Sequence, residues 1–199
     1  MKLFMAGASP YARKVRVFAA ERGLADRLEP IPVNPHERPT ALVEANPLSK
    51  VPTLIDDDGF VHVDSLAICL YLDTLGELPP LVPLNGPERW AVIQRHMLAN
   101  GVMECSVARR MDSLLPGETA RQGVMDKQAE TTRRVLDRCE AMIDAFGTSA
   151  GLDTTALACA LGYLDFRFPD EGWRNGRPRL AAWHEEFERR PALSSAPFH

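Results

Sequence analysis

The residues most suited to binding or catalysis begin with a serine at the start of a predicted helix, and several basic side chains follow it. The stretch is Ser9-Pro10-Tyr11-Ala12-Arg13-Lys14-Val15-Arg16. Ser9 suits an N-cap, because its hydroxyl can accept a hydrogen bond from a first-turn amide, and Pro10 suits the first helical position. The pattern of a plain capped helix does not explain Arg13, Lys14 and Arg16, because the positive end of a helix dipole favours acidic side chains. We therefore expect an anion bound at this helix start, beside the serine hydroxyl.

Each of these residues also has a simpler structural explanation. A plain N-cap would account for Ser9-Pro10 without any ligand, and for that pair alone we favour it. Arg13 and Arg16 could lie on a solvated face or pair with acidic side chains, which outnumber the basic ones by 27 to 23. The functional interpretation therefore depends on other segments that fit the same site.

The first eighty residues predict the elements that position this stretch. Strands are predicted over residues 2–5, 28–33, 53–55 and 60–63, and helices over residues 11–21 and 64–73. The first strand, helix and second strand form a βαβ unit, which implies that the two strands pair in parallel. The second strand contains two prolines, so we expect it at an edge of the sheet. The Asp-Gly turn at Asp58-Gly59 indicates a hairpin. Asp64-Ser65 then caps the helix that follows, which is again a common structural role.

The second half of the chain predicts helices only. Residues 78–87 are rich in proline and form the best domain boundary in the chain. Helical patterns follow over residues 88–115, 119–146, 156–168 and 176–190, with a break at Pro116-Gly117. The most apolar pattern, 156–168, is expected at the centre of a bundle. We predict domains over residues 1–77 and 88–199, joined by the 78–87 linker.

Composition limits the partners and the compartment. The net charge is −4, so nucleic acid is not an expected partner. The four cysteines show no metal-ligand spacing, so we expect no metal, and Cys69, Cys105 and Cys159 are interpreted as reduced core thiols. The apolar run over residues 3–8 is shorter than the ~7–15 residues of a signal-peptide core. No apolar run approaches the ~18 residues of a membrane span, so we expect no membrane contact and a cytoplasmic protein.

Three segments together resemble the thioredoxin-like domain of the glutathione S-transferases, in their serine-type form. They are Ser9-Pro10-Tyr11-Ala12-Arg13-Lys14-Val15, Asn46-Pro47-Leu48-Ser49-Lys50-Val51-Pro52-Thr53-Leu54, and Asp64-Ser65-Leu66-Ala67-Ile68 with Tyr71-Leu72. Residues 158–169 resemble the buried helix of bacterial members, so the likeness covers nearly the whole chain. It implies a glutathione-binding α/β domain of βαβ–ββα order with a mixed sheet and a cis Val51-Pro52 peptide, followed by an all-helical bundle.

The resemblance also implies the chemistry, with glutathione as co-substrate. A free thiol of this kind has a pKa near ~8.5, and the thiolate is the attacking species. Ser9 would donate its hydroxyl hydrogen to the sulfur, while Arg13 and the helix N-terminus add positive potential. Glutathione transfer to a hydrophobic electrophile, serving detoxification, is the leading hypothesis.

Four further residues are implied to bind the rest of glutathione. The backbone of Val51 would pair with the cysteinyl residue as a short strand would. Ser65, at a helix start, would bind the γ-glutamyl carboxylate, and Asp64 would face the α-ammonium group. Lys50 would reach a carboxylate.

The second substrate is expected between the domains, against the first long helix. Candidate lining residues are Met103, Val107, Arg110 and Met111. The resemblance implies a homodimer, in which Asn100 or Glu104 could hold the γ-glutamyl end of the neighbour's glutathione. Two alternatives remain: a non-catalytic carrier or regulator on the same fold, and a glutathione-dependent reductase. We rank the reductase low, because such relatives place a cysteine where Ser9 stands.

One departure concerns the start of the buried helix. The family usually begins this helix with Ser/Thr-x-x-Asp, whereas this chain has Gly151 and Thr154 at those positions. Asp153 is expected to cap the helix one residue later. The departure bears on the stability of the second domain.

Overall fold

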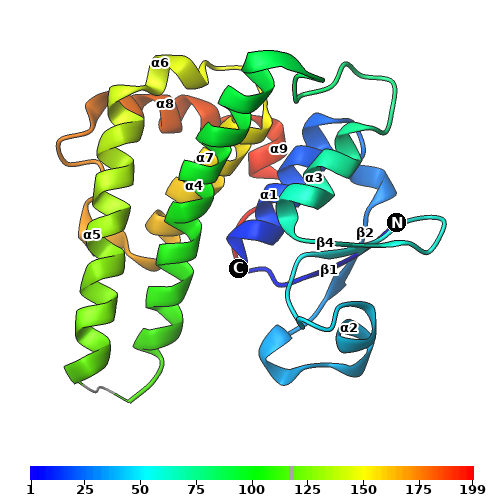
Figure 1. The fold of residues 1–199 in the computed structure, drawn as a ribbon, viewed down its shortest axis with the longest axis horizontal. Coiled ribbons are helices and arrows are strands. Elements are labelled where there is room, and N and C mark those ends of the chain that lie inside the picture. Colours follow the sequence, from blue (N-terminus) through cyan, green and yellow to red (C-terminus); the bar gives the residue numbers. More distant parts are fainter. Residues whose placement is uncertain (117–118) are drawn as a thin grey trace.

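A computed structural model describes residues 1–116 and 119–199 of the protein, in two side-by-side parts (Figure 1). The strands are β1 (Lys2–Met5), β2 (Glu29–Pro32), β3 (Thr53–Ile55) and β4 (Val61–Val63). The first part also contains α1 (Pro10–Glu21), α2 (Thr40–Ala45) and α3 (Ser65–Asp73). The second part contains α4 (Gly86–Ser113), α5 (Thr119–Ala141), α6 (Ile143–Phe146), α7 (Leu152–Arg167), α8 (Pro178–Glu188) and α9 (Pro191–Ser194).

The four strands form one mixed sheet in the order β2-β1-β3-β4. β1 pairs with β2 in parallel, as the βαβ unit requires, and the β1–β3 and β3–β4 pairs are antiparallel. β2 lies at the edge, where its two prolines cost the fewest ladder hydrogen bonds. The predicted fold class, a mixed thioredoxin-like sheet followed by a helical bundle, is confirmed. The cis peptide at Val51-Pro52 is confirmed as well.

Besides the short helix α9, which was not predicted, the helical part differs from the prediction at three points. The helix predicted over residues 119–146 is interrupted at Met142, whose N–H is shared between the carbonyls of Arg138 and Cys139, at 3.2 Å each. The last helix predicted, over 176–190, is shorter, because α8 covers Pro178–Glu188. The predicted break at Pro116-Gly117 falls partly on Gly117, which lies outside the described residues.

The start of the buried helix is the third difference. α7 begins at Leu152, with Gly151 as N-cap, so the expectation that Asp153 caps this helix is wrong. The carboxylate of Asp153 instead accepts a hydrogen bond from Nε of Arg95 on α4, at 2.6 Å. A buried ion pair between two helices thus replaces the local capping box of the family pattern. The side chain of Thr154 donates to the carbonyls of Ser149 and Gly151, at 3.0 and 3.3 Å.

Helix α1 lies between two apolar cores. One core covers the sheet and α3 and includes Val15 and Phe18 of α1. The other surrounds α7, which is packed by α4, α1 and α8, and includes Val17 of α1 and Leu136 of α5. Because α1 belongs to both cores, the helix that begins beside Ser9 is fixed by both parts of the chain. All four cysteines are buried and unpaired, as predicted for Cys69, Cys105 and Cys159.

Two searches of the described residues bear on ligands and membranes. None of the helices in residues 1–116 and 119–199 joins enough length with enough apolar composition to cross a membrane. Over the same residues, no group of three or more His, Cys, Asp or Glu side chains is arranged to hold a metal ion.

Candidate active site

The sheet brings the three predicted site segments to one end of the domain. In the β1–β3 pair Phe4 lies opposite Thr53, so the loop after β1 and the loop before β3 are neighbours. In the β3–β4 pair Thr53 lies opposite Val63, so the start of α3 joins them. Segments that lie up to about sixty positions apart in sequence therefore meet around the N-terminus of α1.

Ser9 occupies the predicted N-cap of α1. Its Oγ accepts a hydrogen bond from the backbone N–H of Ala12 at 3.2 Å, and Pro10 follows in the first turn. The side chain is half-buried, so its hydroxyl hydrogen is available to a ligand that enters beside the helix start. An N-terminus with a hydroxyl donor and the positive end of a helix dipole is suited to an anion.

The loop before β3 is braced so that Val51 presents its backbone. Nδ2 of Asn46 donates to the carbonyl of Lys50 at 3.3 Å, and Oγ1 of Thr53 donates to the same carbonyl at 2.7 Å. Among the described residues, the N–H and C=O of Val51 have no hydrogen-bond partner, so they remain open to an extended ligand. The side chain of Lys50 is exposed. Sequence reasoning missed the bracing role of Asn46, although this residue opens the second motif segment.

The loop before α3 contains a strained residue. Asp64 has φ +73° and ψ 133°, a conformation that is costly for a residue with a side chain. Its carboxylate accepts from the N–H of Leu66 at 2.7 Å, which confirms the predicted cap. Ser65, the first helical residue, is buried. Backbone strain of this kind is often found at ligand-binding sites. Here it occurs in the main chain of Asp64-Ser65, at the start of α3.

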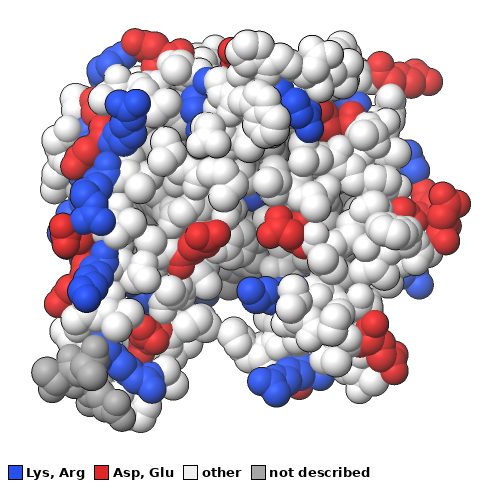
Figure 2. Space-filling view, in the orientation of Figure 1, with Lys and Arg blue, Asp and Glu red and all other residues white. Residues whose placement is uncertain are grey.

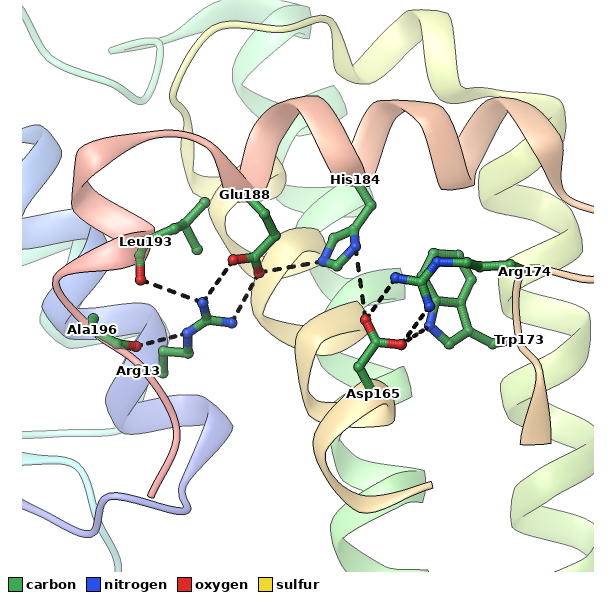
Figure 3. A network of polar contacts seen from close by, with 8 residues as sticks. All are labelled: Arg13, Asp165, Trp173, Arg174, His184, Glu188, Leu193 and Ala196. Atoms are coloured by element: carbon green, nitrogen blue, oxygen red, sulfur yellow. Dashed lines mark hydrogen bonds and ion pairs between the residues drawn. The ribbon is translucent and has the colours of Figure 1, made fainter. Parts of the chain in front are cut away.

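The structure corrects the role expected of Arg13. Its guanidinium forms a paired contact with Glu188 of α8, at 3.1 and 3.0 Å, and it also donates to the carbonyl of Ala196 at 2.9 Å (Figure 3). Burial alone would raise the pKa of Glu188, but hydrogen bonds from His184 and Arg13 outweigh burial and lower it to about 2. Arg13 therefore ties α1 to the helical part and supplies no direct contact for an anion beside Ser9.

The other two basic residues of the opening stretch also have protein partners. Lys14 is fully buried, and its Nζ lies 2.9 Å from Nε2 of His96 and 3.2 Å from Oδ1 of Asn100, both on α4. Burial, and then the Lys14 charge, lowers the pKa of His96 to about 3, so this imidazole is neutral and accepts from the ammonium group. Arg16 donates to the carbonyl of Ser195 at 3.2 Å. All three side chains thus have polar partners in the helical part, where we had expected an anion, although only Arg13 is paired with a carboxylate.

A hollow lies between the two parts on the face shown in Figure 2, with acidic groups on both of its sides. Of the four predicted lining residues, Met103 is fully buried in the helical core, so that prediction is wrong. Val107, Arg110 and Met111 are half-buried on α4. Tyr11, which sequence reasoning did not assign, packs against the helical core, and burial and then Glu104 raise its pKa, so the phenol keeps its proton.

Comparisons with known proteins agree with this geometry. The family model described as the glutathione S-transferase N-terminal domain matches residues 8–75, and the model of the C-terminal domain matches residues 122–186. The chain is 31% identical over 185 residues to the uncharacterized GST-like protein YibF of Escherichia coli K12, covering 90% of each chain. The chain belongs to the glutathione S-transferase family.

Two solved structures of a glutathione transferase family member from Pseudomonas fluorescens Pf-5 are close relatives of this transferase-family chain. Each is 38% identical to it. The first contains bound glutathione and aligns with a TM-score of 0.94 over 98% of each chain. The second contains S-(propanoic acid)-glutathione and aligns with a TM-score of 0.90 over 99% of each chain.

Proposed function

We propose that this protein is a glutathione transferase that adds the thiolate of glutathione to a hydrophobic electrophile. The observation that carries the proposal is the glutathione bound in the Pseudomonas relative, which aligns over nearly the whole chain. The second Pseudomonas structure contains glutathione with propanoic acid on its sulfur, and a thioether of this kind is what the proposed reaction yields. Detoxification in the cytoplasm is the role we propose for it.

Ser9 is the proposed catalytic residue. A serine hydroxyl is not a base at neutral pH, but as a donor it stabilises a thiolate more than the thiol, which lowers the pKa of the glutathione sulfur. The N-terminus of α1 adds a positive potential at the same place. Because Arg13 is committed to Glu188, we assign this stabilisation to the hydroxyl and the helix alone.

The proposed glutathione-binding residues are distributed around the sulfur position. The open backbone of Val51 pairs with the cysteinyl residue, and Lys50 reaches the glycine carboxylate. Ser65 binds the γ-glutamyl carboxylate through its hydroxyl and amide, and the exposed carboxylate of Asp64 faces the α-ammonium group.

A homodimer would complete this end of the site. On α4 the side chain of Asn100 donates to Oε1 of Glu104 at 2.7 Å, and Glu104 is exposed. We propose that Glu104, oriented by Asn100, faces the α-ammonium group of the glutathione held by the neighbouring subunit.

The test compares Ser9→Ala with Ser65→Ala, using glutathione and 1-chloro-2,4-dinitrobenzene. Removing one preorganised donor costs roughly 100-fold in turnover, so Ser9→Ala should lower kcat to this extent while the Kd of glutathione changes little. Ser65→Ala should show the reverse, with weaker glutathione binding and a nearly unchanged kcat. Because Ser9→Ala also removes an N-cap, its thermal unfolding is measured alongside. Equal turnover by Ser9→Ala and wild type would refute the thiolate role.

The same experiment separates the enzyme from a non-catalytic carrier. Retention on immobilised glutathione, together with a rise of thiolate ultraviolet absorbance at neutral pH, supports the transferase. Retention with no thiolate signal and no turnover supports the carrier.

A further inference from the structure

The turn that leads from β1 to Ser9 is covered by a residue from the other end of the sequence. The backbone N–H of Ser9 donates to the carbonyl of Ala6 at 3.0 Å, so residues 6–9 form a β-turn with Gly7 as one of its two central residues. A Cβ added to Gly7 would lie 2.2 Å from Nε2 and 2.3 Å from Cδ2 of His199. The imidazole of His199 therefore occupies the space that a side chain at position 7 would need.

This contact accounts for the glycine at position 7. The φ of Gly7 lies outside the left-handed region, in contrast to the φ of +68° at Gly23 and of +85° at Gly59. A positive φ is therefore not the reason for a glycine in this turn. The close approach of the ring is the reason, because an alanine Cβ would lie well inside van der Waals distance of three ring atoms of His199.

The segment before His199 is held along α1 by hydrogen bonds. Nη2 of Arg16 donates to the carbonyl of Ser195 at 3.2 Å, and Nε of Arg13 donates to the carbonyl of Ala196 at 2.9 Å. The segment thus runs along α1 towards the N-terminal end of the helix. Figure 1 shows the C-terminus beside that end.

Phe198 fixes the direction of the segment immediately before His199. The ring of Phe198 stacks on that of Phe166, with centroids 5.2 Å apart and an angle of 5° between the planes, and its centroid lies 5.7 Å from that of Tyr163. The guanidinium of Arg13 lies 4.7 Å from the centroid of the same ring. Contacts with three side chains from α1 and α7 leave Phe198 little freedom, so the next residue is directed onto the turn.

The position of the Ser9 hydroxyl depends on the same turn. A donor stabilises a thiolate well only when it is already in place before the reaction, without a cost of reorganisation. On the side of the helix Ser9 is fixed by the N–H of Ala12, which donates to Oγ at 3.2 Å. On the other side, Gly7 and Ala8 have almost no side-chain atoms with which to pack. The ring of His199 supplies the packing that these two residues lack.

We propose that His199 is a positioning residue of the active site, whose imidazole packs on Gly7 and fixes the turn that directs the hydroxyl of Ser9 at the glutathione sulfur. This inference rests on the proposed transferase function and adds a residue to the same site. His199 acts through the turn, by the flat shape of its ring. The proton on its imidazole has no part in this role.

The test is a double-mutant cycle of Gly7→Ala and His199→Ala, with glutathione and 1-chloro-2,4-dinitrobenzene as substrates. A catalytic group displaced by ~1 Å can lose ~100-fold in rate, and a loosened turn displaces Ser9 for part of the time. His199→Ala should therefore lower kcat roughly tenfold and change the Kd of glutathione less than about twofold. Gly7→Ala should lower kcat at least as much, because its Cβ displaces the ring.

The double variant measures the contact itself. Without the imidazole there is room for the methyl group, so adding Gly7→Ala to His199→Ala should lower kcat by less than about twofold. Gly123→Ala on α5 is the control, because its Cβ meets nothing within 4 Å and the change should leave kcat unaltered. An equal loss from Gly7→Ala in both backgrounds, or an unchanged kcat in His199→Ala, overturns the proposal.

Two further readouts distinguish positioning from a purely structural role and from proton transfer. In His199→Ala the pKa of the bound glutathione thiol, followed by thiolate ultraviolet absorbance, should rise towards that of free glutathione, while the thermal midpoint of unfolding changes little. His199→Phe keeps a flat ring without a titratable proton, so it should retain the kcat and the pH profile of the wild type. A His199→Phe variant as slow as His199→Ala overturns the proposal.

Hydrogen exchange keeps this test separate from the test of catalysis. If the wild type shows neither turnover nor a thiolate signal, the transferase function fails, and the turn is measured directly by NMR. The amide of Ser9, which closes the turn through the carbonyl of Ala6, should then exchange roughly tenfold faster in His199→Ala than in the wild type or in Gly123→Ala. An unchanged exchange rate of the Ser9 amide refutes the positioning role.

Discussion

Replacing Glu188 by glutamine should loosen the contact between α1 and the last helices. The change keeps the shape of the side chain and removes the charge that pairs with Arg13 and His184. The pKa of Glu188 falls from the usual 4.5 to about 2, in spite of its burial. At ~1.4 kcal/mol for each pH unit, the ionised carboxylate stabilises the fold by about 3 kcal/mol at neutral pH.

The sign of the pH dependence follows from the depressed pKa. In the unfolded chain Glu188 takes up its proton near the usual pKa of 4.5, whereas in the folded chain it does so only near pH 2. The stabilisation is therefore fully present above pH ~5 and is lost as the pH falls towards 2. The difference between wild type and Glu188→Gln should be about 3 kcal/mol at pH 7 and should approach zero near pH 2.

The assay is urea unfolding of wild type, Glu188→Gln and Glu185→Gln between pH 2.5 and 7. Glu185→Gln is the matched control, since Glu185 lies on the same helix and pairs with Arg189 on the exposed surface. The loss of unfolding free energy in Glu185→Gln should stay below ~1 kcal/mol and should depend little on pH, as is usual for surface ion pairs. A Glu188→Gln loss of the same size as the control, or one that is equal at pH 7 and pH 3, would refute the reasoning.

Two further predictions concern the contacts of α1. Gly162→Ala would place a Cβ 2.5 Å from Nη1 of Arg13, so it should destabilise the protein by more than ~2 kcal/mol. Gly101→Ala on α4 is the control, because its Cβ would lie in open space, and it should stabilise the protein by ~0.5–1 kcal/mol. The free energy of unfolding of both variants is measured in urea. Similar changes in this free energy for the two variants would contradict the predicted close contact between Gly162 and Arg13. His96 should remain neutral down to pH ~4 in an NMR titration, because its pKa is about 3, and Lys14→Met should raise that pKa. Titration of His96 near pH 6 in the wild type would contradict the buried contact.

Local signals predicted the first domain well. Ser9-Pro10, the prolines of β2 and the Asp-Gly turn each act over a few residues, and they were sufficient for element order, the N-cap and the mixed sheet. The cis peptide followed from the family motif around Val51-Pro52. The domain limits over residues 1–77 and 88–199, and the roles of Lys50, Val51, Asp64 and Ser65, stay predictions.

Long-range partners could not be read in the same way. The wrong-signed charges at the start of α1 predicted a bound anion, yet Arg13 is balanced by Glu188, 175 positions further along the chain. Nothing in the local pattern distinguishes a carboxylate supplied by a ligand from one supplied by the fold. The face of α4 was equally hard to assign, because Met103 is fully buried in the core whereas Met111, of the same residue type on the same helix, is only half-buried.

The dependence of α1 on the last helices has a consequence for biosynthesis. Arg13 and Arg16 are made at the beginning of translation, but their partners Glu188, Ser195 and Ala196 leave the ribosome some 170 to 180 residues later. The sheet and α3 can assemble early, since domains usually fold as units during synthesis. The helix that presents Ser9 reaches its final anchored position only after the segment around residues 188–196 has emerged. A nascent chain should therefore bring Ser9 to its final position late in synthesis, so that the proposed glutathione site is completed only when nearly the whole protein has been made.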